Sequence, residues 1–242
     1  IMEELHLAAG KRIAEMIGAP AAHVCSSATA GIALTGAAAL TGTDINKVRR
    51  LPNVEGMPHE MIVQKTHRMA YDQAILMSGC KFVEIDPTPE ALAAAITDQT
   101  VGVWVVFSWG LVGQAIPLPQ VAEIAHARGV PVLVDAASEL PPMSNLHRYL
   151  DEGADLVIFS GGKGLRGPQA SGLVIGRPDL VEACRLNDCP NPGIGRSMKM
   201  GKEEIVGLVK AVEICVNRDH EADMQLWERR VQYIIDQLSK VP

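Results

Sequence analysis

The strongest constraint on the fold is a regular alternation between short β-branched runs and longer segments with helical spacing. The clearest run is the apolar stretch Val-Gly-Val-Trp-Val-Val-Phe at residues 101–107. Runs this apolar are typical of strands buried on both faces, and the helical segments between them have the length of crossover connections. The pattern predicts a three-layer α/β/α fold around a mostly parallel sheet.

Seven strands are predicted, at residues 23–26, 61–65, 81–85, 101–107, 130–135, 156–160 and 171–175. Helices are predicted before Gly18 and at residues 29–40, 71–78, 89–96, 119–128 and 146–152. Only a short Gly/Pro loop separates Lys163 from the last strand. Because this loop is too short for a helical crossover, we expect the last strand to run antiparallel to its neighbour.

The C-terminal part of the sequence has a different pattern. Residues 203–239 contain no proline and one glycine, Gly207, and their apolar residues recur at helical spacing. This predicts one long helix, or two helices joined near residues 217–219. We therefore expect a large domain at residues 1–200 and a long helical segment at residues 201–242, which leads toward a small C-terminal domain outside this sequence.

Composition excludes several classes of protein. Membrane spans need about 20 apolar residues, and the longest apolar stretches are far shorter, so no membrane span is expected. The net charge of −6 argues against a nucleic-acid partner, because phosphate neutralisation needs a clustered basic surface. Five cysteines, an odd number, are expected to be free thiols of a cytoplasmic protein, and no metal site is expected.

Polar side chains follow five of the predicted strands at their carboxyl ends. Ligands of open α/β sheets bind outside this edge, so these residues are candidates for one site. They are Ser26, Ser27, Thr29, His67, Arg68, Ser108, Asp135, Ser138, Ser160 and Lys163.

Two of these groups have both a structural and a functional interpretation. The turn at residues 26–29 is made of small residues before a helix, which suits a phosphate at the helix N-terminus, but Ser27 or Thr29 can equally be an ordinary helix cap. Asp135 ends an apolar strand, where a carboxylate serves as a structural cap or pairs with a cationic ring nitrogen. The residues alone leave both questions open.

Lys163 and His67 also allow alternatives. Glycines flank Lys163, which leaves its amine accessible as a phosphate clamp, a surface charge or a Schiff-base nucleophile. A Walker phosphate loop is excluded, because Gly164 stands where Ser or Thr is required and Pro168 prevents an immediate helix. His67 is either a hydrogen-bonded structural residue or a flat ring that stacks on a planar cofactor.

Two segments carry a family resemblance, VLVDAASELPP at residues 132–142 and DLVIFSGGKGLRGPQASG at residues 155–172. Together with the small-residue turn and His67, they resemble fold-type I pyridoxal 5′-phosphate (PLP) enzymes. More narrowly, they resemble the selenocysteine synthase-like group, which contains the L-seryl-tRNA(Sec) selenium transferases and the D-glucosaminate-6-phosphate ammonia-lyases. The resemblance covers essentially the whole chain and implies that residues 1–200 form the PLP-binding large domain.

The resemblance implies a role for each candidate residue. Lys163 would form the Schiff base with PLP, Asp135 would pair with the pyridine nitrogen, and His67 would stack on the ring. These three are the expected catalytic residues. The expected cofactor-binding set is Ser27, Ala28, Thr29, His67, Ser108, Asp135, Ser138, Ser160 and Lys163. Arg196 would bind a substrate carboxylate or phosphate, or else is a surface arginine.

The resemblance also implies an activity. We expect a PLP-dependent lyase that removes the α-proton and a β-hydroxyl from a small amino acid or amino-sugar acid, giving a keto acid and ammonia. The alternatives are selenium transfer to seryl-tRNA(Sec), racemase or aldolase chemistry, and a non-catalytic binding module. The expected partners are a small-molecule substrate and further copies of the chain, in a homodimer or higher homo-oligomer.

Overall fold

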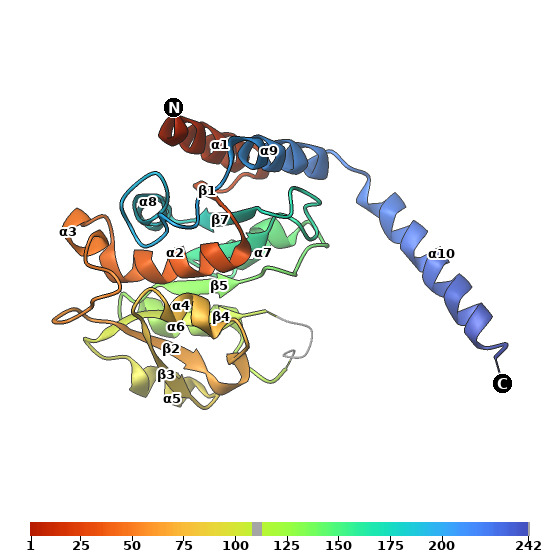
Figure 1. Ribbon diagram of the computed structural model, residues 1–242. Helices are drawn as coiled ribbons and strands as arrows, with labels where there is room; N and C mark the ends of the chain where they lie inside the picture. The colour runs from red at the N-terminus through yellow and green to blue at the C-terminus, as the bar shows by residue number, and fades with distance from the viewer. Residues whose placement is uncertain (108–112, 242) are drawn as a thin grey trace.

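The computed structural model of the chain describes residues 1–107 and 113–241 and shows three layers, a central sheet between two layers of helices (Figure 1). Within these residues the sheet has seven strands in the order β1-β7-β6-β5-β4-β2-β3. The strands are β1 (Ala22–Cys25), β2 (Glu60–Gln64), β3 (Lys81–Ile85), β4 (Thr100–Val106), β5 (Val132–Asp135), β6 (Leu156–Ser160) and β7 (Gly172–Gly176). The predicted α/β fold is confirmed.

The helices connect and cover these strands. They are α1 (Met2–Ile17), α2 (Ala28–Thr41), α3 (Ile45–Val48), α4 (Asp72–Leu76), α5 (Pro89–Ala95), α6 (Leu118–His126), α7 (Asn145–Asp151), α8 (Pro178–Asn187), α9 (Lys202–Val216) and α10 (His220–Leu238), with one 3₁₀ turn, η1 (Lys65–His67). The sequence pattern did not predict α3, η1 or α8. The two short elements have no room for a helical repeat, and α8 (Pro178–Asn187) was not among the predicted helices.

β7 is the one antiparallel strand, as predicted, and it lies between β1 and β6. The pairs β2–β3, β2–β4, β4–β5 and β5–β6 are parallel. In the register of β7, Gly172 is opposite Cys25 of β1 and also opposite Ser160 of β6. The carboxyl ends of β1 and β6 therefore meet at the same edge of the sheet, although they are far apart in the sequence.

Each face of the sheet buries its own apolar core. On one face, α1, α5, α6, α7 and α9 contribute side chains such as Ile13, Leu92 and Leu208. On the other face, α2, α4 and α8 contribute Leu34, Ile75 and others. Successive residues of a strand point to opposite faces, so the sheet side chains divide between the two cores.

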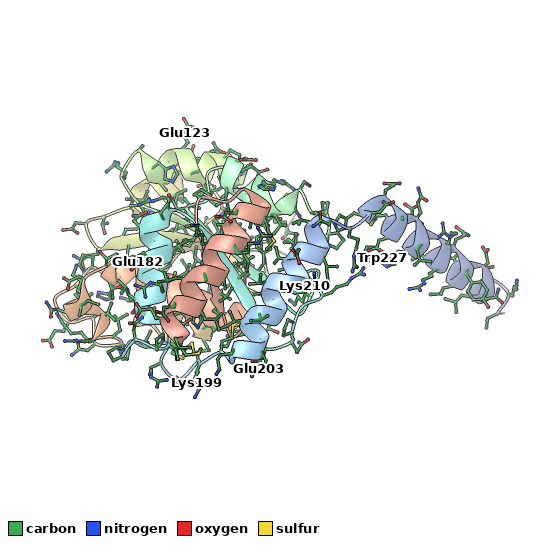
Figure 2. The ribbon with its side chains drawn as sticks, turned by 90° about the horizontal axis from the view of Figure 1, so that it is seen from above. Glu123, Glu182, Lys199, Glu203, Lys210 and Trp227 are labelled. Atoms are coloured by element: carbon green, nitrogen blue, oxygen red, sulfur yellow. The ribbon has the colours of Figure 1, made fainter. Side chains whose placement is uncertain are left out.

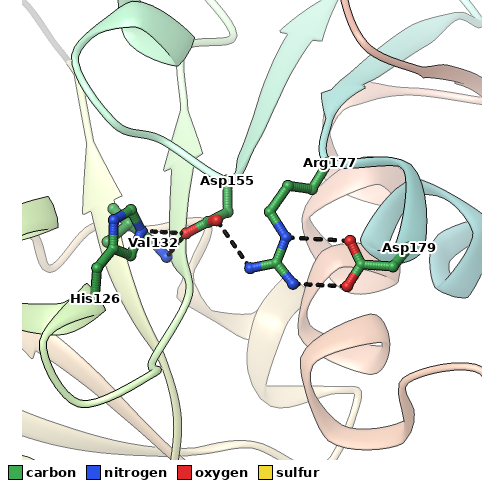
Figure 3. Close-up of polar contacts among 5 residues, drawn as sticks. All are labelled: His126, Val132, Asp155, Arg177 and Asp179. Atoms are coloured by element: carbon green, nitrogen blue, oxygen red, sulfur yellow. Dashed lines mark hydrogen bonds and ion pairs between the residues drawn. The ribbon is translucent and has the colours of Figure 1, made fainter.

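A buried carboxylate stabilises the other end of the parallel strands, where they begin. It belongs to Asp155, which directly precedes β6 (Figure 3). Its Oδ2 accepts a hydrogen bond from the Val132 N–H at 2.7 Å and lies 2.8 Å from His126 Nε2. Its Oδ1 accepts from Arg177 Nη1 at 3.0 Å, and Arg177 also forms a bidentate pair with Asp179. This network connects β5, β6, α6 and α8, so Asp155 has a structural role.

The C-terminal segment forms two helices that meet near Asn217, which is the second of the two predicted arrangements. α9 packs against α1 in the helical layer, whereas α10 extends away from the rest of the chain (Figures 1 and 2). No residue of α10 is buried. Among the described residues no helix is both long and apolar enough to cross a membrane.

Candidate active site

The register of the sheet brings most of the predicted site residues to one edge. Asp135 of β5 lies beside Val106 of β4 and Ile158 of β6. η1, which carries His67, follows β2 at the same edge, where the Val106 N–H donates to His67 Nδ1 at 3.4 Å. The carboxyl ends of β1, β2, β4, β5 and β6 thus surround one region, as expected for a ligand site of an open α/β sheet.

A turn of small residues joins β1 to α2. Ser27 is the N-cap of α2, and its Oγ accepts a hydrogen bond from the Ala30 N–H at 3.0 Å. The first N–H groups of a helix have no intrahelical acceptor, so those of Ala28 and Thr29 are available to an anion. The structural and functional interpretations of this turn are therefore compatible, because the cap uses Ser27 Oγ and leaves two N–H groups for a ligand.

The same turn packs closely on β7. A Cβ atom on Gly172 would lie 2.4 Å from the Ser27 carbonyl carbon and 2.8 Å from the Ala28 nitrogen. Only glycine allows this approach, so Gly172 fixes the start of α2 beside the end of β6, where Ser160 lies. The sequence analysis did not select Gly172, because a lone glycine at the start of a strand carries no functional pattern.

Asp135 is buried, with 4% of its surface exposed. Its Oδ1 accepts a hydrogen bond from the Ala137 N–H at 2.9 Å, and among the described residues no hydrogen bond reaches Oδ2. Burial raises the pKa of this carboxyl, whereas the Ala137 N–H and the positive charge of Lys163 lower it. The carboxylate is thus positioned by the backbone and still has one oxygen for a cationic partner.

His67 is also buried, with 3% exposure, and burial lowers its pKa to about 4. The imidazole is therefore neutral at neutral pH, and Nδ1 is the acceptor for Val106. A neutral, flat ring in this position suits stacking on an aromatic ligand, and it adds no positive charge at this edge of the sheet.

Lys163 lies in the loop between β6 and β7, and its side chain is exposed. The loop is closed by backbone hydrogen bonds from the Arg166 N–H to the Lys163 carbonyl at 2.9 Å and from the Gly167 N–H to the Gly161 carbonyl at 2.8 Å. Gly164 packs against the backbone of Leu140, where a Cβ would lie 2.3 Å from the carbonyl oxygen. The glycines around Lys163 thus allow close packing beneath the lysine, and its amine remains accessible.

The other predicted residues lie in different surroundings. Ser160 ends β6 at the same edge, but Ser138 is exposed and its Oγ donates to Glu139 Oε1 at 3.3 Å. Ser108 lies outside the described residues. Arg196 is an exposed residue in the loop between α8 and α9, where its Nη1 contacts Cys189 Sγ at 3.4 Å. None of the recorded contacts of Arg196 in the described part of the chain involves another candidate residue.

A cavity of about 690 Å³ adjoins His67. Its walls include Phe107, Glu139, Arg148 and Tyr149, which sequence analysis did not select. Arg148 and Tyr149 belong to α7, whose sequence reads as an ordinary amphipathic helix, so no signal in the sequence marks them as residues that line this cavity. Asp135 and Lys163 are not among its lining residues.

A second cavity, of about 540 Å³, lies at the opposite end of β1, between α1 and α8. Its lining includes His6, which stacks on His23, and His23 Nε2 lies 2.8 Å from Asp188 Oδ2. Burial lowers the pKa of His6, and both His6 ring nitrogens are buried without a hydrogen-bond partner in the described residues. This cavity shares no lining residue with the carboxyl edge, so it is separate from the candidate active site.

The fold is that of a PLP-dependent transferase-like domain, as the resemblance implied. Residues 5–188 match the aminotransferase class-V family, and the chain belongs to that family. Family membership implies pyridoxal 5′-phosphate as the cofactor, which confirms the predicted cofactor.

Two curated relatives match nearly the whole chain. A 5′-C-glycyluridine monooxygenase-decarboxylase from a Streptomyces species is 38% identical over 100% of this chain and 61% of its own length. A D-glucosaminate-6-phosphate ammonia lyase from Salmonella typhimurium is 31% identical over 96% of this chain and 62% of its own length. The chain thus spans about three fifths of the length of these relatives.

A solved structure of a D-glucosaminate-6-phosphate ammonia-lyase superposes with a TM-score of 0.80 and 32% sequence identity. The match covers 88% of this chain and 58% of that chain. These similarities confirm the predicted resemblance to the selenocysteine synthase-like group of PLP proteins.

Proposed function

We propose that this chain is the cofactor-binding part of a PLP-dependent lyase that acts on a small amino acid or amino-sugar acid. The observation that carries the proposal is the convergence of Lys163, Asp135, His67 and the Ser27 turn at one edge of the sheet. Each group comes from a different strand end, and together they supply an amine, a buried carboxylate, a neutral ring and an anion site. An ordinary structural role explains each group singly but not their grouping.

The residues fit the cofactor. The N–H groups of Ala28 and Thr29, with Ser27 and Ser160, would hold its phosphate at the start of α2, where the helix dipole favours negative charge. Asp135 Oδ2 would accept a hydrogen bond from the pyridinium nitrogen, and His67 would cover one face of the ring. Ser108 and Ser138 are proposed as further contacts to the cofactor.

Bound PLP supplies an electron sink that stabilises negative charge at the substrate α-carbon. Asp135 supports this, since a carboxylate beside the ring nitrogen favours its protonated form. Lys163, which would hold PLP covalently, would also supply the amine that takes the proton from the substrate α-carbon and returns a proton later. Loss of the β-hydroxyl and hydrolysis of the released enamine then give a keto acid and ammonia.

The ammonia-lyase assignment rests on the similarity to the Salmonella relative along 96% of the chain. Selenium transfer to seryl-tRNA(Sec) begins with the same elimination, but the net charge of −6 does not favour a tRNA substrate. Racemase or aldolase chemistry uses the same Lys163 and Asp135, so product analysis must separate these activities. A non-catalytic module is disfavoured, because such a module does not need both an accessible lysine, Lys163, and a buried carboxylate, Asp135, at the same edge of the sheet.

A second candidate function follows from the Streptomyces relative, which is 38% identical over the whole chain. Its name describes the loss of a carboxyl group from a glycyl substituent with oxygenation. Such a reaction would break the bond from the α-carbon to the carboxylate instead of the bond to hydrogen, and it would consume O₂. The proposed lyase reaction consumes no O₂, so the two functions differ in a measurable reactant.

The remaining features of the proposal concern the whole protein. We propose a cytoplasmic homodimer or higher homo-oligomer, with no nucleic acid as partner and with Arg196 as a contact to a substrate carboxylate or phosphate. Residues 1–200 would form the PLP-binding large domain, and residues 201–242 would lead toward a small C-terminal domain. The extension of α10 away from the rest of the chain (Figure 1) is consistent with this division, although α9 packs against α1.

The proposal is tested in two stages. The purified protein is first mixed with PLP, reduced with borohydride and digested, and mass spectrometry locates the modified lysine. Modification at Lys163, and its loss in Lys163→Ala, is the expected result; modification spread over surface lysines would overturn the proposal. The protein is then assayed with β-hydroxy amino acids and phosphorylated amino-sugar acids for ammonia, keto acid, CO₂ and O₂ uptake. Ammonia without O₂ uptake supports the lyase, whereas CO₂ with O₂ uptake supports the second candidate.

A further inference from the structure

The loop that carries Lys163 makes an unusual contact with α10. Arg166, three residues after the lysine, has φ +55°, and it is the only non-glycine residue with positive φ in the described part of the chain. Most side chains disfavour this left-handed conformation, so contacts elsewhere must stabilise it. The guanidinium of Arg166 makes such contacts, a hydrogen bond and a cation–π contact, with two residues of α10.

Two residues one turn apart on α10 hold the guanidinium. Arg166 Nη2 lies 3.1 Å from Asp223 Oδ2, and Arg166 Cζ lies 5.5 Å from the centre of the Trp227 ring. Trp227 lies on the part of α10 nearer to the domain (Figure 2). A charge-assisted hydrogen bond and a cation–π contact on one guanidinium fix both its position and its plane.

A backbone hydrogen bond connects Arg166 to the lysine. The Arg166 N–H donates to the Lys163 carbonyl at 2.9 Å, which closes the turn between the two residues. Leu165, which lies between Lys163 and Arg166 in the sequence, is buried in the core, and Gly164 packs on Leu140. The turn is thus held by the core through Leu165 and by α10 through Arg166, and the Lys163 side chain is exposed.

We propose that Arg166 is a positioning residue, through which Asp223 and Trp227 of α10 hold the turn that presents the Lys163 amine to the cofactor. This rests on the proposed function, because it assigns Lys163 the covalent bond to PLP. The proposal adds that the placement of the amine depends on α10, a helix that buries none of its own residues. Arg166 itself need not touch the cofactor or the substrate.

The decisive experiment separates covalent capture from non-covalent binding. PLP and 4′-deoxypyridoxine phosphate share the ring and the phosphate, but the second compound has no aldehyde and cannot bond to Lys163. We would measure the rate of covalent capture of PLP by the apoprotein, trapped with borohydride, and the affinity of 4′-deoxypyridoxine phosphate by calorimetry. A positioning role affects the first measurement and leaves the second unchanged.

Arg166→Gly is the main variant, because glycine adopts the left-handed conformation without strain and the loop therefore still folds. We expect capture of PLP to slow roughly 10- to 100-fold, as for a reacting group displaced by about 1 Å. The affinity for 4′-deoxypyridoxine phosphate should stay within about twofold of the wild-type value. Trp227→Ala removes the other partner of the contact and should slow capture in the same way. In the double variant the two effects on the capture rate should not be additive.

Arg218→Ala is the matched control. Arg218 Nη1 also contacts Asp223 Oδ2, at 3.4 Å, but Arg218 lies outside the Lys163 loop. This variant should capture PLP at the wild-type rate, and Arg166→Lys, which keeps the charge, should recover part of the loss. If both Arg166→Gly and Trp227→Ala capture PLP at the wild-type rate, the positioning role of Arg166 is wrong and the proposed function is unaffected. If the wild-type protein captures no PLP at Lys163, the proposed function itself is wrong.

Discussion

The positive charge of Lys163 lowers the pKa of the buried Asp135 carboxyl. Burial raises the pKa of Asp135, and the charge of Lys163, 28 residues later in the sequence, acts against that rise. The lysine charge is thus felt at the carboxylate although the lysine side chain itself is exposed. The amine and the acid are therefore near enough for the charge of one to alter the pKa of the other.

Asp135→Asn tests the carboxylate. The substitution keeps an oxygen for the Ala137 N–H, so the loop should stay in place, but it removes the negative charge beside the ring nitrogen. We expect turnover to fall by roughly 10²- to 10³-fold, with covalent capture of PLP at Lys163 retained. Steady-state kinetics and borohydride trapping measure the two effects. Wild-type turnover in Asp135→Asn would contradict the proposed role.

His67 makes the stability of the apoprotein depend on pH. Its pKa of about 4 in the folded chain lies below the ordinary value of 6.5, because burial disfavours the charged ring. Between these two values the unfolded chain binds a proton that the folded chain does not, so stability falls as the pH is lowered through this range. His67→Phe should lose less stability between about pH 7 and pH 4.5, by about 2 to 3 kcal/mol.

Urea unfolding of the two proteins at both pH values measures this difference. His6, whose pKa is also lowered by burial, is present in both proteins, so its contribution cancels. Equal pH dependence in the wild type and in His67→Phe would show that His67 is not the buried neutral ring described above.

Gly172→Ala tests the close contact between β7 and the Ser27 turn. The added methyl group would lie 2.4 Å from the Ser27 carbonyl carbon, so the start of α2 must move away from Ser160. We expect the affinity for 4′-deoxypyridoxine phosphate to fall at least roughly tenfold, which corresponds to about 1.4 kcal/mol. Gly102→Ala is the control, because its Cβ would meet only side chains, Met61 and Leu133, at 3.0–3.3 Å. If both variants weaken binding equally, the effect is one of general packing.

Asp155→Ala is expected to destabilise the fold without altering the site. It removes the acceptor of the buried Val132 N–H and the partner of Arg177 at the far edge of the sheet. An unpaired buried donor costs about 1–3 kcal/mol, and this loss should appear in urea unfolding. The affinity for 4′-deoxypyridoxine phosphate, measured where the variant is fully folded, should stay at the wild-type value; a large loss of affinity would show that Asp155 acts on the site.

The sequence predicted the sheet well, because a buried strand is a short run of apolar and β-branched residues that can be recognised without its neighbours. β3 and β6 begin and end at the predicted residues, and the short loop after Lys163 predicted the antiparallel β7. The other predicted boundaries lie within two residues of the observed ones, since helix and strand ends depend on hydrogen bonds that no local pattern determines. α3 and η1 were missed because one turn of helix has no periodicity.

The candidate site was predictable only as a set of strand ends. Asp135, His67 and Lys163 stand at such ends, and their shared edge follows from the parallel sheet. Gly172 and Arg166 escaped notice because their importance lies in contacts with Ser27 and Trp227, which are remote in sequence. Such contacts arise from the packing of whole elements, and no window of the sequence contains both partners.

The position of β1 has a consequence for how the protein is made on the ribosome. β1 is an edge strand whose one partner in the described sheet is β7, and most of the domain is translated between the two. The nascent chain must therefore keep its first strand unpaired until β7 has left the exit tunnel. Loop closure over so long a separation is slow, and unpaired strands favour aggregation. A chaperone that binds early during translation would shelter residues 22–25 for this interval.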